Sequence, residues 1–217
     1  MATYSRIEDM KLVGGGLCFD FANTVGGRVP AESGRGKRAF AVVRDKLGGY
    51  ADLVTWGRRV GLLTGTEARR LLRAAEGRPD EAAAALARGV AMREAAFHIF
   101  RAIVDGRPPD AAGLETLNRE LQVARRHERL VHTRDGFVWQ WDEREGALDC
   151  VLWPVARSAA EILASGDLNR VKACGGAECG WIFVDISRNR SRQWCDMQDC
   201  GNLAKVRRFR QRWQREE

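Results

Sequence analysis

The sequence lacks any apolar run that approaches the roughly 18 residues needed to cross a bilayer. It also lacks the features of a secretory signal, because its first ten residues are polar and the glycines at 14–16 interrupt any apolar core. Without export, an oxidising environment is not expected, which argues against disulfides. We therefore expect a cytoplasmic protein with no membrane partner.

Histidine and catalytic motifs are scarce as well. His98, His127 and His132 are the only histidines, and no two of them share the spacing of a metal or acid–base pair. The glycines at 14–16 lack both the Gly-Lys-Ser/Thr ending of a phosphate loop and the spacing of a dinucleotide site. Because no catalytic group converges with another, the sequence predicts a protein that is not an enzyme.

The composition is that of an ordinary globular protein with an excess of basic residues. At 217 residues, with 45% hydrophobic and 30% charged residues, the chain can hold one medium domain and one small one. The formal net charge is +7, and the sequence pI is about 9.4. This balance favours a polyanionic partner without identifying it.

Four cysteines near the end of the chain form two pairs with the same internal spacing. Four residues separate Cys174 from Cys179 and Cys195 from Cys200, and fifteen lie between the pairs. Four converging thiolates suit a tetrahedral ion and leave no open position, which predicts one structural Zn²⁺. Spacing alone also admits iron or an iron–sulfur cluster, and two disulfides are a further alternative.

The residues around these cysteines predict a strand at 180–185, a polar turn at 187–191 and a basic helix after Cys200. Apolar residues at 203, 206, 209 or 210, and 213 give that helix one apolar stripe. Asn202 is placed to cap the helix or to support the site. The candidate nucleic-acid contacts are Arg188, Arg190 and Arg192 in the turn and Lys205, Arg207, Arg208, Arg210 and Arg212 in the helix. The alternative for such a helix is a merely solvated charged face.

The run from Cys174 to Asn202 resembles the CGNR zinc finger. The matching positions are the four cysteines, Trp181, Phe183, Asp185, Ser187-Arg188-Asn189-Arg190-Ser191-Arg192, Trp194, Met197 and Gly201-Asn202. The fourth signature position is Leu203, so the Arg often found there is missing, which leaves the metal ligands untouched. We expect Trp181 and Trp194 to pack around the metal. The resemblance implies a bacterial DNA-binding transcriptional regulator.

The residues before the finger predict a mainly helical unit. Helical spacing, capping residues and prolines predict helices over residues 50–61, 64–76, 79–106, 108–126 and 150–165. Residues 130–133 and 137–141 predict two strands joined by an Asp-Gly turn. Residues 12–24 predict a glycine turn into a short buried strand or helix, and residues 26–38 a mobile surface loop. The predicted fold class is α+β: a mainly helical amino-terminal domain with a β-hairpin, then a small four-cysteine zinc finger of strand, turn and basic helix.

This order of elements resembles the ABATE domain that commonly precedes CGNR fingers. The residues that carry the resemblance are 17–24, Asp52-Leu53, Trp56, Leu117-Asn118, Trp139 and Trp141. With a boundary at Gly166-Asp167-Leu168, it implies an ABATE-like regulatory domain at 1–166 and the finger at 167–217. It also implies a regulator that responds to a stress or small-molecule signal, without naming the signal.

Several alternatives stay open. A second hypothesis makes the zinc unit a scaffold for protein or RNA interaction without direct DNA binding. A homodimer formed through the helical domain would enlarge the limited contact of a single finger. Cys18 and Cys150 are expected to be inert core thiols, with redox sensing as the alternative. Asp20, Asn23 and Thr24 are expected to serve turns or caps rather than to line a pocket.

Overall fold

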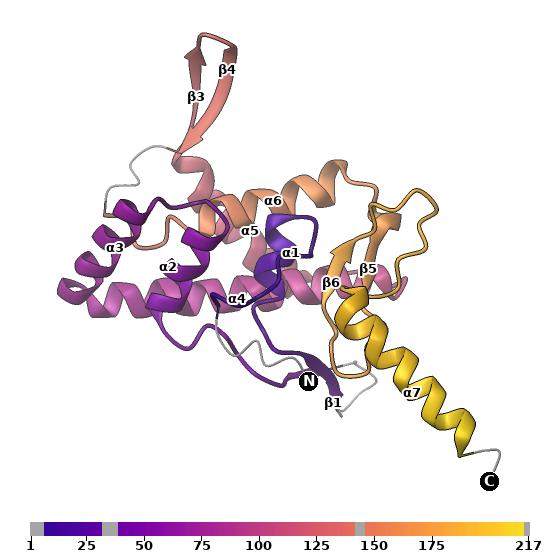
Figure 1. Ribbon diagram of the computed structural model, residues 1–217. Helices are drawn as coiled ribbons and strands as arrows, with labels where there is room; N and C mark the ends of the chain where they lie inside the picture. The colour runs from indigo at the N-terminus through magenta and orange to yellow at the C-terminus, as the bar shows by residue number, and fades with distance from the viewer. Residues whose placement is uncertain (1–6, 32–38, 142–145, 215–217) are drawn as a thin grey trace.

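The structure is a computed structural model that describes residues 7–31, 39–141 and 146–214 (Figure 1). Its helices are α1 (Leu17–Ala22), α2 (Tyr50–Arg59), α3 (Gly65–Gly77), α4 (Pro79–Val104), α5 (Ala111–Arg126), α6 (Leu152–Ser165) and α7 (Asn202–Trp213). Its strands are β1 (Arg28–Ala31), β2 (Ala39–Val42), β3 (Glu128–Thr133), β4 (Gly136–Trp141), β5 (Val171–Ala173) and β6 (Ile182–Val184). Two short turns, the 3₁₀ turn η2 (Leu168–Arg170) and the π-helical turn η3 (Met197–Gly201), complete it. The described strands form separate two-stranded antiparallel sheets, so the predicted α+β class is confirmed.

The long helix α4 lies at the centre of the helical core. Helices α1, α2, α3, α5 and α6 all contact it, and β5 and β6 of the finger contact it as well. The largest side chains of this core, among them Trp56, Trp153 and Phe100, are fully buried. Burial of each such side chain stabilises the fold by about 1.5–3 kcal/mol.

Local sequence signals place the helix starts. The Thr64 hydroxyl accepts a hydrogen bond from the Glu67 amide at 3.2 Å, and the Glu67 carboxylate accepts one from the Thr64 amide at 2.6 Å, which confirms the predicted capping box. Asp110 caps α5 by accepting from the Gly113 amide at 2.6 Å. The sequence predicts a glycine turn followed by a short strand or helix at residues 12–24. The structure has the helix, α1, directly after the glycines.

The prediction of a mobile surface loop at 26–38 is wrong in part. Arg28–Ala31 form β1, which pairs antiparallel with β2 so that Arg28 lies opposite Val42. The remaining residues of that prediction, 32–38, lie outside the described residues. Pro30 and the surrounding glycines concealed the strand, because proline and glycine are depleted from strands.

Strands β3 and β4 form the predicted hairpin, but its turn is at residues 134–135, one residue earlier than the predicted Asp-Gly turn. Gly136, at a φ of 117°, is the first residue of β4 and lies opposite Thr133. The hairpin extends away from the helical body (Figure 1). The finger lies at another end of the molecule, where β5 and β6 pack beside α1 and α4 and where α7 runs outward to the carboxy-terminal end (Figure 1). In the part of the chain that the structure describes, no helix combines the length and apolar character needed to cross a membrane.

Candidate metal centre and basic helix

The four cysteines come from four different local structures and meet at one point. Cys174 follows β5, Cys179 lies in the turn before β6, Cys195 lies in the following loop, and Cys200 belongs to η3. Their Sγ atoms all lie within 4.8 Å of one another. The Sγ of Cys195 is 3.5 Å from that of Cys179 and 3.6 Å from that of Cys200.

These distances fit a metal tetrahedron and not a pair of disulfides. A zinc ion with Zn–S bonds of about 2.3 Å requires sulfur atoms about 3.8 Å apart, whereas a disulfide bond is about 2.05 Å long. The thiols are free. The disulfide alternative is therefore wrong, and the donor set is the four-sulfur set of a structural site.

The surrounding backbone is shaped to this cluster. The Cys174 sulfur accepts hydrogen bonds from the amides of Gly176 at 3.4 Å and Cys195 at 3.2 Å, contacts that orient a metal-bound thiolate. A Cβ added at Gly176 would lie 3.1 Å from the Cys200 sulfur and 3.5 Å from the Cys174 sulfur. The knuckle, which we define as residues 174–180, therefore passes directly beside the four sulfurs.

The thiols need a cation to ionise together. The pKa of the Cys179 thiol is raised, first by its contact with the Cys174 sulfur. The pKa of the Cys195 thiol is also raised, and its own contact with the Cys174 sulfur is the first cause. A divalent cation stabilises all of the thiolates, so metal binding and proton release are coupled.

Asp185 organises the turn between the two cysteine pairs. Its fully buried carboxylate accepts hydrogen bonds from Lys172 Nζ at 2.7 Å, the Ser187 hydroxyl at 2.6 Å and the Arg192 amide at 2.9 Å. Burial by itself would raise the pKa of Asp185, but the Lys172 ion pair and the other donors outweigh it and hold the pKa below the ordinary range. The Asp-x-Ser spacing is thus a structural requirement of this turn.

The three turn arginines occupy different environments. Arg188 and Arg190 are exposed, and Arg190 is paired with Asp167 at 3.0 Å. The Arg192 guanidinium instead donates to the carbonyl oxygens of residues 13, 184, 194 and 195 and lies 4.1 Å above the Phe183 ring. Arg192 therefore holds the finger together and ties it to the amino-terminal segment.

The tryptophans pack as expected. Trp181 and Trp194 both lie against the small buried cluster formed by Phe183 and the cysteines. The Trp181 indole N–H donates to the Val25 carbonyl at 3.0 Å, so this side chain also joins the finger to the residues after α1.

The finger is docked on the amino-terminal segment through main-chain contacts that the sequence did not reveal. The buried Asn23 amide donates to the Ile182 carbonyl at 2.9 Å and accepts from the Ile182 amide at 3.0 Å. The Arg28 amide donates to the carbonyl of the metal-ligand candidate Cys179 at 3.0 Å. A Cβ at Gly27 would lie 2.0 Å from the Glu178 carbonyl oxygen, so only glycine permits this approach. Asn23 is the C-cap residue of α1, as expected of a cap, and its side chain also bridges to β6.

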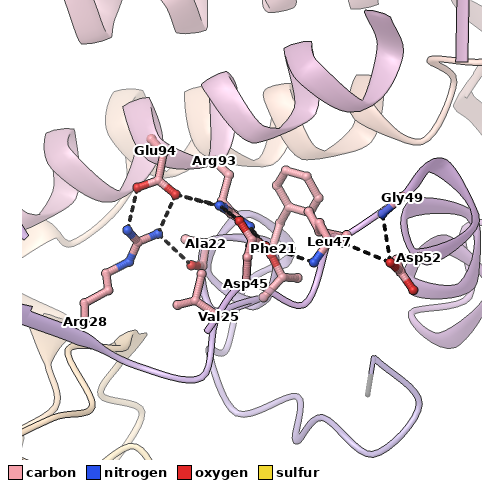
Figure 2. Close-up of polar contacts among 12 residues, drawn as sticks. Phe21, Ala22, Val25, Arg28, Asp45, Leu47, Gly49, Asp52, Arg93 and Glu94 are labelled. Carbon is pink, nitrogen blue, oxygen red and sulfur yellow. Dashed lines mark hydrogen bonds and ion pairs between the residues drawn. The ribbon is translucent and has the colours of Figure 1, made fainter. Parts of the chain in front are cut away.

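A network of ion pairs continues from this contact into the helical core. Arg28 contacts Glu94 with both terminal nitrogens and lies 3.9 Å from the centre of the Phe97 ring. Arg93 donates to Glu94 at 2.9 Å and to the two carboxylate oxygens of Asp45 at 2.6 and 2.7 Å. Figure 2 shows the series from Arg28 through Glu94 and Arg93 to Asp45. Both guanidinium groups are buried, so these carboxylates are needed to compensate their charge.

Helix α7 buries none of its residues. All of the basic side chains assigned to it by sequence, Lys205, Arg207, Arg208, Arg210 and Arg212, are exposed. The predicted apolar stripe is exposed too, with Leu203, Val206, Phe209 and Trp213 between 49% and 64% accessible.

Asn202 does not act as the N-cap of α7. It is the first residue of the helix, and its side-chain amide donates to the Gln198 carbonyl at 3.0 Å. The capping side chain belongs to Asp196, which accepts from the amides of Gln198 and Asp199 at the start of η3. Asp196 is also paired with Lys11 at 2.8 Å, which adds another contact to the amino-terminal segment.

The remaining candidates do not converge. His98 lies on α4, His127 follows α5 and stacks on Trp153 at 3.8 Å, and His132 lies on β3. Within the described ranges, the four cysteines are the only group of His, Cys, Asp and Glu with metal-binding geometry. Cys18 and Cys150 are buried, and burial raises the pKa of the Cys18 thiol to about 12, the opposite of what redox sensing requires.

Comparison with known families agrees with this geometry. Residues 15–166 match ABATE, described as "Putative stress-induced transcription regulator", and residues 170–213 match the CGNR zinc finger. Neither description names an enzyme. No curated protein matches the chain. Together with the four-sulfur cluster, the CGNR match establishes one structural Zn²⁺. The chain belongs to the ABATE family and carries a CGNR zinc finger after its ABATE region.

Proposed function

We propose that the protein is a DNA-binding transcriptional regulator. In this proposal residues 167–217 bind DNA, and residues 1–166 form a regulatory domain that receives a stress or small-molecule signal. The observation that carries the proposal is α7, a helix that stands clear of the body (Figure 1). Its basic side chains are exposed along its length.

The electrostatics of α7 suit a polyanion. Residues 202–213 contain five Lys or Arg and no Asp or Glu. Among the described residues, none of these five side chains is held in an ion pair, so their charge is available to phosphates. Arg188 and Arg190 supply the second basic cluster, and the ion pair of Arg190 with Asp167 is exposed, so a phosphate can replace that partner. Arg192 is left out of the contact set, because its donors are engaged inside the finger.

The test is a titration of the zinc-loaded chain with random duplex DNA at several salt concentrations. Each phosphate contact contributes about 0.9 to the slope of log affinity against log salt. The variant Lys205→Gln/Arg208→Gln/Arg212→Gln is expected to bind more weakly at low salt and to lose about two to three units of that slope.

A matched control is available on α3, where Arg69, Arg70 and Arg73 are exposed. Replacing these three by Gln removes the same charge from another helix and is expected to leave the slope unchanged. Equal losses in both variants would mean that net charge alone attracts DNA. Absence of binding at low salt would overturn the proposal.

One observation favours a second candidate function, a zinc-stabilised module for protein or RNA interaction. The apolar stripe of α7 is exposed beside its basic residues, and phosphates cannot cover it. If this function is correct, duplex DNA fails to bind, whereas a partner is retained after nuclease treatment, or single-stranded RNA binds instead. Substitution of Val206 and Phe209 by Gln would then abolish retention of that partner.

A further inference from the structure

A cavity of about 480 Å³ lies where the finger meets the amino-terminal part of the chain. Residues of β1, β2 and α4 line it, together with residues of the knuckle. Its volume is within the range of roughly 300–1,000 Å³ that is typical of small-molecule sites. Of the four clustered cysteines, only Cys174 is among the described residues that line the cavity, so it is separate from the metal position.

The charged groups at the cavity leave an excess of positive charge. Arg28 and Arg101 line it, and none of the described lining residues is acidic. The buried Arg28 is balanced by Glu94. Arg101, in contrast, shares the carboxylate of Asp105 with Arg107, so two guanidinium groups meet one carboxylate at this end of α4. An anion in the cavity would balance the remaining charge.

Arg101 retains a donor that an anion can use. Its Nε and Nη2 both donate to the same oxygen of Asp105, at 3.1 and 3.0 Å. In the part of the chain that the structure describes, its Nη1 has no hydrogen-bond partner. The guanidinium lies 4.9 Å from the centre of the Phe40 ring, which also lines the cavity. A charged donor therefore lies beside an apolar surface.

The zinc centre restricts how an anion can lie in the cavity. Four thiolates and one Zn²⁺ carry a formal charge of −2, and Cys174 lines the cavity. This charge repels a carboxylate, which is therefore directed to Arg101. The lining also includes Pro30 and Ala31, which together with Phe40 suit the apolar body of a ligand.

We propose that this cavity binds a small organic carboxylate with an apolar body. The ligand contacts both β1 and the knuckle, which are joined by the 3.0 Å hydrogen bond from the Arg28 amide to the Cys179 carbonyl. Binding therefore stabilises the docked position of the finger. The role of this ligand as a regulatory signal rests on the proposed function, whereas its binding does not depend on DNA.

The experiment is ligand-observed NMR on the full, zinc-loaded chain, with benzoate as the probe and without DNA. A ligand of this size is expected to bind with a Kd of about 1–10 mM. Benzamide has the same ring without the charge and is expected to bind about tenfold more weakly or worse. The variant Arg101→Gln is expected to weaken benzoate binding by a similar factor, because it removes the charged donor.

The matched control is Arg107→Gln. This variant removes the same charge and an ion pair with the same carboxylate, that of Asp105, but Arg107 is not among the described lining residues. Because salt screens exposed charges, the benzoate Kd should change by less than about twofold. Circular dichroism and zinc content check that both variants are folded.

Three outcomes would overturn the proposal. One is the absence of benzoate binding to the wild-type chain at about 10 mM. Another is benzamide binding as tightly as benzoate, a comparison that uses only the wild type and so does not depend on how a variant folds. The third is an equal loss of benzoate binding in Arg101→Gln and Arg107→Gln, which would mean that net charge alone attracts the probe. Because DNA is absent, these outcomes are independent of the DNA-binding test.

Discussion

At the scale of single residues, Asn23 joins the finger to the residues that follow α1. Its side-chain amide pairs with both main-chain groups of Ile182, in the way that a neighbouring strand would. The side chain is 1% exposed, so water cannot replace these bonds. A primary amide offers a donor and an acceptor together, which few other side chains can do.

The variant Asn23→Ala is expected to destabilise the zinc-loaded protein by about 1–3 kcal/mol, because it leaves a buried amide and carbonyl of Ile182 unsatisfied. Urea unfolding followed by circular dichroism measures the loss. The control Asn118→Ala changes an exposed asparagine on α5 and should alter stability by no more than about 0.5 kcal/mol. Equal stability of Asn23→Ala and wild type would contradict the bridging role.

At the scale of elements, the ion-pair network fixes β1 and the segment before α2 against α4. Glu94 serves both buried arginines, Arg28 and Arg93 (Figure 2). Burial by itself would raise the pKa of Glu94, but the hydrogen bonds and charge of Arg28, followed by the charge of Arg93, hold it below its ordinary value. The pKa of Asp45 is also lowered, in this case by Arg93 against the effect of burial.

A lowered carboxyl pKa in the folded state gives acid-sensitive stability. The contribution of Glu94 is fully present above the unfolded pKa of about 4.3 and is lost as the pH falls through the lower folded pKa. The variant Glu94→Gln should therefore be less stable than wild type at pH 7, and the difference should shrink as the pH falls below about 4.

Unfolding curves from pH 7 to pH 3 measure this difference. Protonation of the zinc ligands affects both proteins, so it does not account for a change in the difference between them. The control Glu115→Gln alters an exposed carboxylate on α5 and should track the wild type at every pH. A gap between Glu94→Gln and wild type that stays constant with pH would disprove the ion-pair explanation.

At the scale of the whole molecule, direct contacts join the zinc centre to the amino-terminal segment and so to the helical core. Asn23, Gly27 and Arg28 contact β6 or the knuckle, and Lys11 is paired with Asp196 and Asp199 beside the last cysteine. The metal fixes the knuckle and η3, and these elements in turn bind the amino-terminal segment. Loss of the ion should therefore loosen more than the finger.

Removal of zinc with a chelator is expected to lower the Tm of the entire chain by about 10 °C or more. Structural zinc contributes about 10–16 kcal/mol in isolated fingers, and each kcal/mol shifts the Tm of a chain of this size by about 2–4 °C. Differential scanning calorimetry of the loaded and stripped protein measures the shift. A Cys200→Ser chain should have the Tm of the stripped protein, and the chelator should not change that Tm. Two transitions, with the larger one unmoved by chelator, would show that the units are independent.

The sequence by itself determined the features that depend on neighbouring residues. Cysteine spacing predicted the four-sulfur set, Thr64 with Glu67 predicted a helix start, and the Asp135-Gly136 turn predicted the hairpin, because caps, turns and ligand loops are local. It also determined which residues are basic on the last helix. The predicted core helices followed from apolar spacing in the same way.

Only the tertiary structure decided which of these side chains are engaged inside the finger and which are exposed at its surface. Arg190 and Arg192 are equivalent in the sequence pattern, yet the guanidinium of Arg192 lies inside the finger, where carbonyl oxygens from distant segments meet. Asn23 and Gly27 gained their roles from β6 and the knuckle, about 150 residues later in the chain. Such contacts depend on how elements pack, and no local pattern of residues encodes the approach of a distant backbone.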